Sequence, residues 1–542
     1  MHFDLFLSYH IPMSYTVCIP TAGTGTRLGT FTKNLNKSLV EINNKPIISH
    51  IIEKFDKSAK FVIPIGHKAE IVKNYLSFAH PDLDIITIPI SPYEGPGSSL
   101  GTTLNLSRDY LNEPFIFCSC DTIVEESNFE LDQNWLGWDE LKDTSSYRTL
   151  STKDEHILEI YEKLSSNSNK AYIGLAGIKD YEKFWSNFDN APKGERARGE
   201  VAGIKLENMP FEGRHFSWFD TGNPSQLSRA RQKLNDEEVS VLPKEDEKIW
   251  FVNSNVIKFS TDEDFIQKRT ERSSLLLPFV PEVSASSKNM YLYKYIEGDV
   301  LSRIINEEIF DELLTELDNF WEKRDLNDKQ SGEFEGVCSE FYQDKTYDRV
   351  NDYLNRYPED VKEFKINGTQ CSPIYDLLEA VDWHQLIDGY PVRFHGDLHF
   401  ENIIYSSKNK KFTFLDWRQG FGGLMEYGDI YYDLAKLLHG MVVPHPSISK
   451  GEYSITESED NKTLDIYRKE KIQNIEKKYN TWIKENGYSL NKVGMLCSLI
   501  FLNISSLHHH PYSKFLFSLG HYGLQETISK GEVDWNSVSS HS

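Results

Sequence analysis

The sequence has few cysteines, no excess of positive charge and no long hydrophobic run. Six of its 542 residues are cysteine, and none stand in the CxxC spacing of a zinc site. Lysine and arginine total 59 against 82 aspartates and glutamates, so the net charge of -23 disfavours a basic surface for nucleic acid. No stretch reaches the roughly 18 to 20 consecutive apolar residues of a membrane-spanning helix. We therefore expect small-molecule ligands, no nucleic acid and no membrane span.

The scarcity of cysteine also bears on the compartment. Cys118 and Cys120 stand two apart in an apolar run, where a strand would point both side chains to one face, and we expect them to be buried and reduced. The first segment carries Asp4 within its apolar part and has no basic region, unlike a secretory signal peptide. These features indicate the cytoplasm. We interpret residues 1–14 as an N-terminal extension, with Met13 as a second candidate start.

Two patterns divide the chain, as its length leads us to expect. Residues 15–235 alternate short apolar strands with amphipathic helices, which predicts a mostly parallel sheet covered on both faces, the Rossmann-like, doubly wound α/β class. Residues 236–248 are polar and acidic, as expected of a linker. Residues 249–530 begin with predicted strands and continue mainly as helices, and residues 531–542 form a tail.

A glycine-rich loop follows the first predicted strand. Ligands of parallel sheets bind beyond the carboxyl ends of the strands, where Ala22, Gly23, Gly25 and Thr26 stand. Glycine lets backbone N–H groups approach a triphosphate, and Arg27 would face its phosphates. The loop is neither a P-loop nor the dinucleotide fingerprint, because it lacks GK[ST] and a third glycine. By itself it fits a tight strand-to-helix turn equally well.

The continuation of this loop carries more information. Its GTRL sequence leads to Lys37 and then to the pair Lys45-Pro46, and Trp218-Phe-Asp-Thr-Gly222 precedes a predicted helix further on. This pattern resembles the sugar-phosphate nucleotidylyltransferase family over roughly residues 15–235. Three positions depart from the family, which has proline or glycine there: Thr30, Asn36 and Cys120.

The resemblance implies a metal-dependent site for nucleotidylyl transfer. It assigns Asp121 and Asp220 to Mg²⁺ and the turn that contains Gly101 to the nucleotide base. Arg27 and Lys37 would neutralise phosphate oxygens. The attacking phosphate is already an anion, so such a site needs positive charge and orientation rather than a general base.

A second motif, His395-Gly-Asp397-Leu-His-Phe-Glu-Asn402, is the most specific in the sequence, and Asp416 follows it after a short strand. A base for an acceptor hydroxyl followed by two metal ligands is the order used in kinase-type phosphoryl transfer. The motif resembles the aminoglycoside phosphotransferase and choline kinase superfamily over about residues 248–530. The resemblance implies a bilobal α+β fold, Asp397 as the base, Asn402 and Asp416 as Mg²⁺ ligands, and ATP as phosphoryl donor.

The start of this second region fits the same resemblance. Lys258 stands in a predicted strand where an ATP-phosphate lysine belongs, and Glu271 on the next predicted helix is its candidate ion-pair partner. Arg418 would either bind an acidic group of the acceptor or cap its own loop. An aromatic cage for a cationic acceptor such as choline would use Trp417, Tyr431 and Tyr432.

The two regions have complementary chemistry, because a kinase makes a phosphate monoester and a nucleotidylyltransferase consumes one. We predict a bifunctional enzyme that phosphorylates a sugar or sugar-like polyol with ATP. It would then use CTP, UTP, GTP or dTTP to make an NDP-activated donor for surface polysaccharide or glycoconjugate synthesis. One alternative is a choline or amino-alcohol kinase joined to a CTP:phosphocholine-type cytidylyltransferase. Others are a kinase with a non-catalytic, nucleotide-sensing first domain and a drug-inactivating kinase; the oligomeric state is open.

Overall fold

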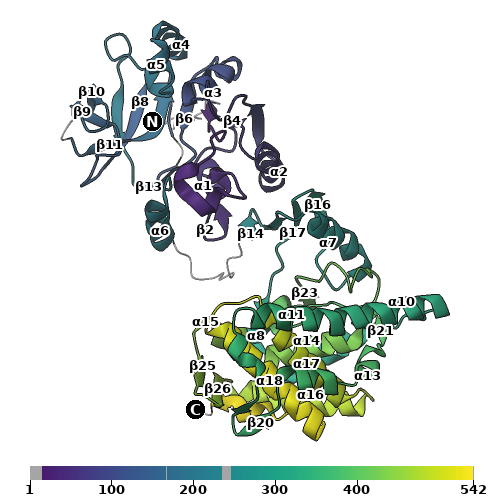
Figure 1. Ribbon diagram of the computed structural model, residues 1–542. Coiled ribbons are helices and arrows are strands. Elements are labelled where there is room, and N and C mark those ends of the chain that lie inside the picture. The colour runs from purple at the N-terminus through teal and green to yellow at the C-terminus, as the bar shows by residue number, and fades with distance from the viewer. Residues whose placement is uncertain (1–14, 128, 166–167, 235–245, 541–542) are drawn as a thin grey trace, which may run out of the picture. The chain divides into compact units, whose positions relative to one another are not determined.

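The computed structural model describes residues 15–127, 129–165, 168–234 and 246–540 (Figure 1). The predicted N-terminal extension, most of the predicted linker and the last two residues of the predicted tail lie outside the described residues. The chain divides into two compact units. The first comprises the chain up to residue 263 together with 284–295, and the second comprises 264–283 and everything from 296 onward. Within the described ranges, every helix is too short or too polar to cross a lipid bilayer.

The first unit is built on a nine-stranded sheet with the order β5-β4-β1-β6-β11-β8-β12-β10-β9. Its first four strands run parallel to one another: β5 (Asp84–Pro89), β4 (Lys60–Ile65), β1 (Thr16–Cys18) and β6 (Phe115–Cys118). The other five form a mixed edge: β8 (Trp135–Glu140), β9 (Thr149–Lys153), β10 (His156–Tyr161), β11 (Lys170–Ile178) and β12 (Glu212–His215). The predicted α/β class is confirmed, and its parallel part ends at β6.

Both faces of this sheet are covered. Along β1, Val17 and Cys18 enter two different apolar clusters, so the strand is buried on both sides. Such a strand is apolar throughout, which explains the continuous run that predicted it. All six cysteines of the chain are free and buried, as expected for Cys118 and Cys120. The helices of this unit are α1 (Ile47–Ile52), α2 (Ala69–Ala79), α3 (Leu100–Leu106), α4 (Tyr181–Asn190), α5 (Lys193–Arg196) and α6 (Pro224–Lys233).

A four-stranded sheet, ordered β14-β15-β17-β16, follows the predicted linker. Its strands are β14 (Glu247–Val252), β15 (Asn255–Ser260), β16 (Val283–Ser287) and β17 (Met290–Lys294), and β14 and β15 form the predicted hairpin. Trp250 is buried against Tyr75 of α2, with the ring centroids 5.0 Å apart. Asn253 donates a hydrogen bond to the Ala79 carbonyl. The core of the large sheet therefore continues into this small one.

The second unit is mainly helical, as predicted. Its helices are α7 (Glu263–Leu276), α8 (Leu301–Ile304), α9 (Glu307–Phe320), α10 (Asp328–Ser339), α11 (Lys345–Leu354), α12 (Ile374–Ala380), α13 (Trp383–Ile387), α14 (Ile430–Val442), α15 (His445–Ser449), α16 (Glu470–Glu485), α17 (Leu490–Ser505) and α18 (Tyr512–Lys530). Two small sheets flank the motif His395–Asn402: β18 (Asp299–Val300) with β22 (Ile403–Ser406) and β23 (Lys411–Phe414), and β21 (Pro391–Val392) with β24 (Gly428–Asp429).

A five-stranded sheet in the second unit was not predicted. It consists of β19 (Phe364–Ile366), β20 (Thr369–Cys371), β25 (Tyr453–Glu457), β26 (Asn461–Tyr467) and β27 (Ser539–Ser540). Short strands with exposed polar residues carry a weak apolar signal, which is why the helical pattern around them dominated the sequence interpretation.

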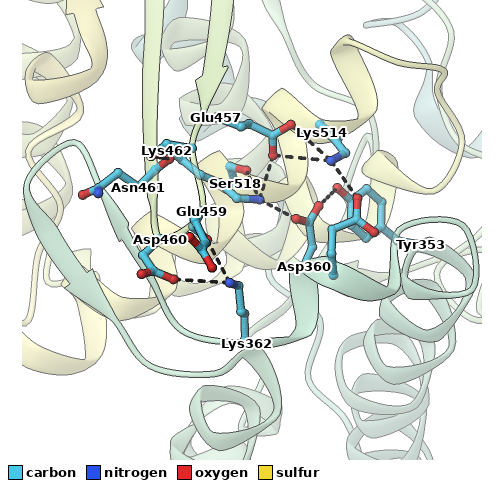
Figure 2. A network of polar contacts seen from close by, with 12 residues as sticks. Tyr353, Asp360, Lys362, Glu457, Glu459, Asp460, Asn461, Lys462, Lys514 and Ser518 are labelled. Carbon is cyan, nitrogen blue, oxygen red and sulfur yellow. Dashed lines mark hydrogen bonds and ion pairs between the residues drawn. The ribbon is translucent and has the colours of Figure 1, made fainter.

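Buried ion pairs and hydrogen bonds connect this sheet to the helices (Figure 2). Lys462 of β26 lies with its Nζ 2.6 Å from Asp360 Oδ1 and 3.2 Å from Glu457 Oε1. Lys514 of α18 contacts Glu457 Oε2 at 3.1 Å, and Tyr353 of α11 donates to Asp360 at 2.5 Å. The side chains of Lys462 and Asp360 are only 2% and 1% exposed, yet each has its partners. We call these five residues the Lys462 network.

Candidate active sites

The glycine-rich loop of the first unit leads from β1 into a 3-10 helix, Thr26–Thr32. Gly25 has φ 67°, and a Cβ there would lie 2.8 Å from Lys37 Cβ, so both backbone conformation and space require glycine. Ala22 is buried, whereas a Cβ on Gly23 would meet nothing within 4 Å, so its space is open. The loop thus has the predicted backbone character, and Thr26 begins the turn that presents Arg27.

Asp121 is the centre of charge at this end of the sheet. Its Oδ2 lies 3.1 Å from Lys37 Nζ and 3.6 Å from Arg27 Nη2. Burial alone would raise the pKa of Asp121, but the charge and hydrogen bond of Lys37, with the charge of Arg27, outweigh it and lower the pKa. Arg27 is 70% exposed at the side chain, which leaves its guanidinium accessible to a ligand. The structure therefore brings three of the predicted residues together.

Asp220 joins the same group through strand pairing. β13 (Trp218–Asp220) runs antiparallel to β7 (Thr122–Val124), and Thr221 N donates to the Asp121 carbonyl at 3.1 Å. A Cβ placed on Gly222 would lie 3.0 Å from Asp220 Oδ1, 3.3 Å from Asp121 Oδ2 and 3.5 Å from Arg27 Nη2. The two carboxylates and the arginine thus converge on the space beside Gly222.

The donor set suits a divalent cation. Burial raises the pKa of Asp220, and the charge of Asp121 raises it further, so the two acids destabilise each other's ionised forms. Carboxylate oxygens are the ligands that Mg²⁺ prefers, and a cation between them would relieve this repulsion. Asp121 and Asp220 are therefore suitably placed to hold it.

Two further residues support this site: Tyr147, which sequence reasoning missed, and Asn36, which it noted only as a departure from the family. Tyr147 Oη donates to Asp220 Oδ2 at 2.7 Å from a loop distant in the chain. Asn36, at a position where the family has proline, donates to the carbonyls of Thr21 at 2.8 Å and His67 at 2.7 Å. The sequence showed that Asn36 replaces the proline of the family. It did not show that the Asn36 amide would stabilise the loop by hydrogen bonds.

Gly101 has a local structural explanation. A Cβ on this residue of α3 would lie 1.7 Å from the carbonyl oxygen of Arg196, so the two segments approach too closely for any side chain. This contact accounts for glycine without a ligand. The assignment of Gly101 to the nucleotide base stays a prediction.

In the second unit, Asp397 and Asn402 are joined directly. Asn402 Nδ2 donates to the backbone oxygen of Asp397 at 2.9 Å and to its Oδ2 at 3.1 Å. The other carboxylate oxygen, Oδ1, lies 2.7 Å from Lys436 Nζ of α14. Burial would raise the pKa of Asp397, but the charges of Lys436 and His399 outweigh it and hold the pKa well below its usual range. Asp397 is therefore an ionised carboxylate beside a buried lysine.

Asp416 completes the predicted set. Leu415 N donates to the Asn402 carbonyl at 2.7 Å, which places the next residue, Asp416, beside the motif. Asp416 has φ 58°, a left-handed conformation uncommon outside glycine and often found at functional sites. Its Oδ1 contacts Arg269 Nη1 of α7 at 3.1 Å. Carboxylate and amide oxygens of Asp416 and Asn402 form a hard donor set that suits Mg²⁺.

Two side chains hold the candidate catalytic loop by hydrogen bonds to its backbone. Asp433 accepts from the N–H groups of His395 and Gly396, both at 2.7 Å. Arg272 of α7 is fully buried and donates to the carbonyls of Met425 at 2.9 Å and His395 at 3.3 Å. Sequence reasoning missed Arg272 because an arginine on a polar helix is ordinarily solvated.

Lys258 and Glu271 belong to different units. Lys258 lies on β15 and is 6% exposed. Glu271 of α7 is exposed and accepts a hydrogen bond from Gln267 Nε2 at 2.8 Å. Their pairing around ATP stays a prediction.

Comparison with known families gives two matches. Residues 275–450 match the family model described as the phosphotransferase enzyme family, and residues 17–129 match that of the MobA-like NTP transferase domain. The chain joins a nucleotidyltransferase domain to a phosphotransferase domain.

Relatives of the nucleotidyltransferase domain are distant. The bifunctional protein GlmU of Methanocaldococcus jannaschii is 26% identical over 225 residues, which cover 40% of this chain and 53% of that protein. The UTP–glucose-1-phosphate uridylyltransferase AglF of Haloferax volcanii is 31% identical over 105 residues, covering 19% of this chain and 41% of that protein. The chain thus spans about half the length of the first of these relatives.

Among solved structures, the CTP:phosphocholine cytidylyltransferase of Streptococcus pneumoniae has 19% sequence identity and a TM-score of 0.36. The match covers 41% of this chain and all of that one.

Proposed function

We propose that the protein is a bifunctional transferase whose phosphotransferase domain phosphorylates a hydroxyl compound with ATP. Its nucleotidyltransferase domain then transfers a nucleotidyl group from a second NTP to that phosphate. One observation supports the proposal: in each domain, side chains that the sequence predicts to be catalytic or metal-binding lie close together. Asp121 and Asp220 converge with Arg27 and Lys37 in the first. The second joins Asp397, Asn402 and Asp416.

In the first step, the acceptor oxygen attacks the γ-phosphorus of ATP and ADP leaves. Asp397 is ionised and can accept the hydrogen bond of the attacking hydroxyl, orienting it and taking its proton as the P–O bond forms. Asn402 and Asp416 would hold Mg²⁺, which when bound neutralises charge on the ATP phosphates. Asp433 and Arg272 keep the loop that carries Asp397 in place through its backbone.

In the second step, an oxygen of the new phosphate monoester attacks the α-phosphorus of the second NTP and pyrophosphate leaves. No proton has to be removed, because the nucleophile is an anion. Arg27 and Lys37 supply positive charge to the phosphates, and Gly23 and Gly25 allow close approach of the backbone. Mg²⁺ would be held by Asp121 and Asp220.

A sugar or sugar-like acceptor fits the relatives, since one of them is named as a uridylyltransferase of glucose 1-phosphate. The product would be an NDP-activated donor for surface polysaccharide or glycoconjugate synthesis, with CTP, UTP, GTP or dTTP as the nucleotidyl donor. ATP and the other NTPs are cytoplasmic metabolites, so we place both reactions in the cytoplasm.

Choline as acceptor is less well supported by the structure. Trp417 is 1% exposed, and Lys492 Nζ lies 4.4 Å from the centroid of the Tyr431 ring. A cation already covers one face of Tyr431, and Trp417 is buried. Trp417 and one face of Tyr431 are therefore not available to surround a cationic acceptor, as the predicted aromatic cage requires.

Two variants test the sequence of reactions. Full-length protein is incubated with ATP, each second NTP and a panel of sugars, polyols and their phosphates, and the products are read by mass spectrometry. Asp397→Asn should lower NDP-product formation from the free acceptor at least about a hundredfold but leave formation from the phosphorylated acceptor intact. Asp220→Asn should abolish NDP-product formation from both while ADP release persists. Asp460→Asn, at an exposed carboxylate in the second unit, is the control and should change neither.

The scheme is wrong if Asp397→Asn leaves product formation from the free acceptor unchanged. Absence of pyrophosphate release with all four NTPs across the phosphorylated panel would instead favour a nucleotide-sensing first domain.

A further inference from the structure

Three basic side chains of the second unit lie near one another, and one of them contacts Asp397. Lys436 contacts its Oδ1, as described above. Arg418 lies against the catalytic loop, since its N–H donates to the His395 carbonyl at 3.0 Å and a Cβ on Gly396 would lie 2.6 Å from Arg418 Cβ. Lys345 opens α11 in a different part of the chain. We call Lys345, Arg418 and Lys436 the acceptor-side cations.

One aromatic ring brings two of these cations together. Lys345 Nζ lies 4.2 Å from the centroid of Phe341, and the guanidinium carbon of Arg418 lies 4.8 Å from the same centroid. Burial, together with the charges of Arg418, Arg349 and Lys436, lowers the pKa of Lys345 to about 7. These basic side chains therefore repel one another.

The charges of this group do not balance. Lys436 is neutralised by Asp397. Within the ranges that the structure describes, Lys345 and Arg418 have no carboxylate within ion-pair distance. The Arg418 Nε is buried without a hydrogen-bond acceptor in the same part of the chain. A protein of net charge -23 thus leaves two neighbouring cations uncompensated beside its catalytic carboxylate.

Lys436 and Asn402 contact different carboxylate oxygens of Asp397. Asn402 bonds Oδ2 of Asp397, whereas Lys436 contacts Oδ1. In an in-line transfer, the attacking hydroxyl and the leaving ADP are on opposite sides of the phosphorus. If Asn402 holds Mg²⁺ at the ATP phosphates, Oδ1 and Lys436 would face the acceptor, and we infer that Arg418 and Lys345 lie toward it as well.

We propose that the acceptor carries a carboxylate or phosphate group in addition to its hydroxyl, and that Arg418 and Lys345 bind this anion. The inference rests on the proposed kinase function and names its substrate class. Guanidinium binds carboxylate and phosphate through paired hydrogen bonds, and an ammonium adds charge. A hydroxy acid or a sugar phosphate satisfies both cations, whereas an amino alcohol such as choline would meet like charge.

The test measures binding to the full chain with Mg²⁺ and a non-hydrolysable ATP analogue present. D-Glycerate is the carboxylate probe, glycerol 3-phosphate the phosphate probe, and glycerol and choline the neutral and cationic probes. We expect one of the two anions to bind at least about tenfold more tightly than glycerol or choline, and the better anion identifies the group. Arg418→Gln and Lys345→Gln should each weaken its binding by about tenfold or more, and Arg418→Lys by less.

Arg349→Gln is the matched control. Arg349 lies on α11 as well, but its Nη1 has Asp352 Oδ2 at 3.8 Å, so its loss should change anion binding less than about threefold. The proposal is overturned if neither anion binds more tightly than glycerol, or if Arg418→Gln and Lys345→Gln bind the anion as tightly as the unmodified protein does.

Binding of the ATP analogue is followed in the same titrations. If the analogue binds in an Asn402-dependent manner and the anions do not, the acceptor class is wrong and the kinase function stands. If Asn402→Ala does not affect analogue binding, the kinase site itself is wrong.

Discussion

Two groups of basic side chains in the second unit differ in whether each cation has a carboxylate partner. In the Lys462 network every cation is matched: Lys462 contacts Asp360 and Glu457, and Lys514 contacts Glu457. Among the acceptor-side cations only Lys436 has a carboxylate in the described chain. A matched buried pair offers nothing to a ligand and serves the fold. Unmatched cations weaken the fold, and a bound anion would compensate them.

Breaking the matched group should have the largest effect on stability. Lys462→Met removes the ammonium but leaves Asp360 buried, and among the described residues Tyr353 is then its remaining side-chain donor. An uncompensated buried charge costs about 3–5 kcal/mol. We expect the free energy of unfolding of the second unit to fall by that amount, measured by urea denaturation of the full chain.

Lys362→Met is the control for this comparison. Lys362 pairs with Asp460 at 3.3 Å nearby, but the two side chains are 46% and 78% exposed. An exposed pair contributes about 0–1 kcal/mol. Equal losses in the two variants would mean that burial does not distinguish the Lys462 network, contradicting the contrast drawn here.

The sequence predicted the parts of both sites that are contiguous. Gly23 to Arg27 and His395 to Asn402 each form one loop, so their spacing alone carries the chemistry. Asp220 was identified as a candidate metal ligand because it stands in a recognisable motif, Trp218 to Gly222, that precedes a predicted helix. Its position beside Asp121 depends on the β13–β7 pairing, which no local pattern specifies.

The residues that were missed come from distant segments. Lys436 meets Asp397 from a helix 39 positions along the chain, and Arg272 reaches His395 across 123 positions. Lys345 and Arg418 share a ring only in three dimensions. Sequence reasoning left Arg418 equally between binding an acidic group and capping its loop. The uncompensated charge around it favours the first.

A buried histidine near the Lys462 network should make the folded protein less stable at acidic pH. His521 of α18 is 1% exposed and its Nε2 lies 2.7 Å from the Ser372 carbonyl oxygen, so it donates as a neutral ring. Burial lowers the pKa of His521 to about 4, against about 6.5 in the unfolded chain. Below pH 6.5 the unfolded chain therefore binds a proton that the folded chain does not, and stability falls as the pH falls.

The expected loss from His521 is about 2 kcal/mol between pH 7 and pH 5. His521→Gln keeps a side-chain donor but cannot titrate, so its unfolding free energy should fall by that much less over the same range. Denaturant titrations at pH 7, 6 and 5 measure the difference. Parallel pH profiles for the two proteins would contradict the assignment of a neutral, buried His521.

Removing a cation that has no carboxylate partner should increase the free energy of unfolding, whereas breaking a matched pair should decrease it. Lys345 has a folded pKa of about 7, below its usual value of 10.5, so between these two pH values the unfolded chain binds more protons and stability rises with pH. Lys345→Met removes a charge that its neighbours repel and keeps an apolar chain against Phe341. We expect the free energy of unfolding at pH 7 to increase by about 1 kcal/mol, with a smaller gain at pH 10. A loss of stability at pH 7 would show that Lys345 is compensated in the folded protein. The distinction between the Lys462 network and the acceptor-side cations would then fail.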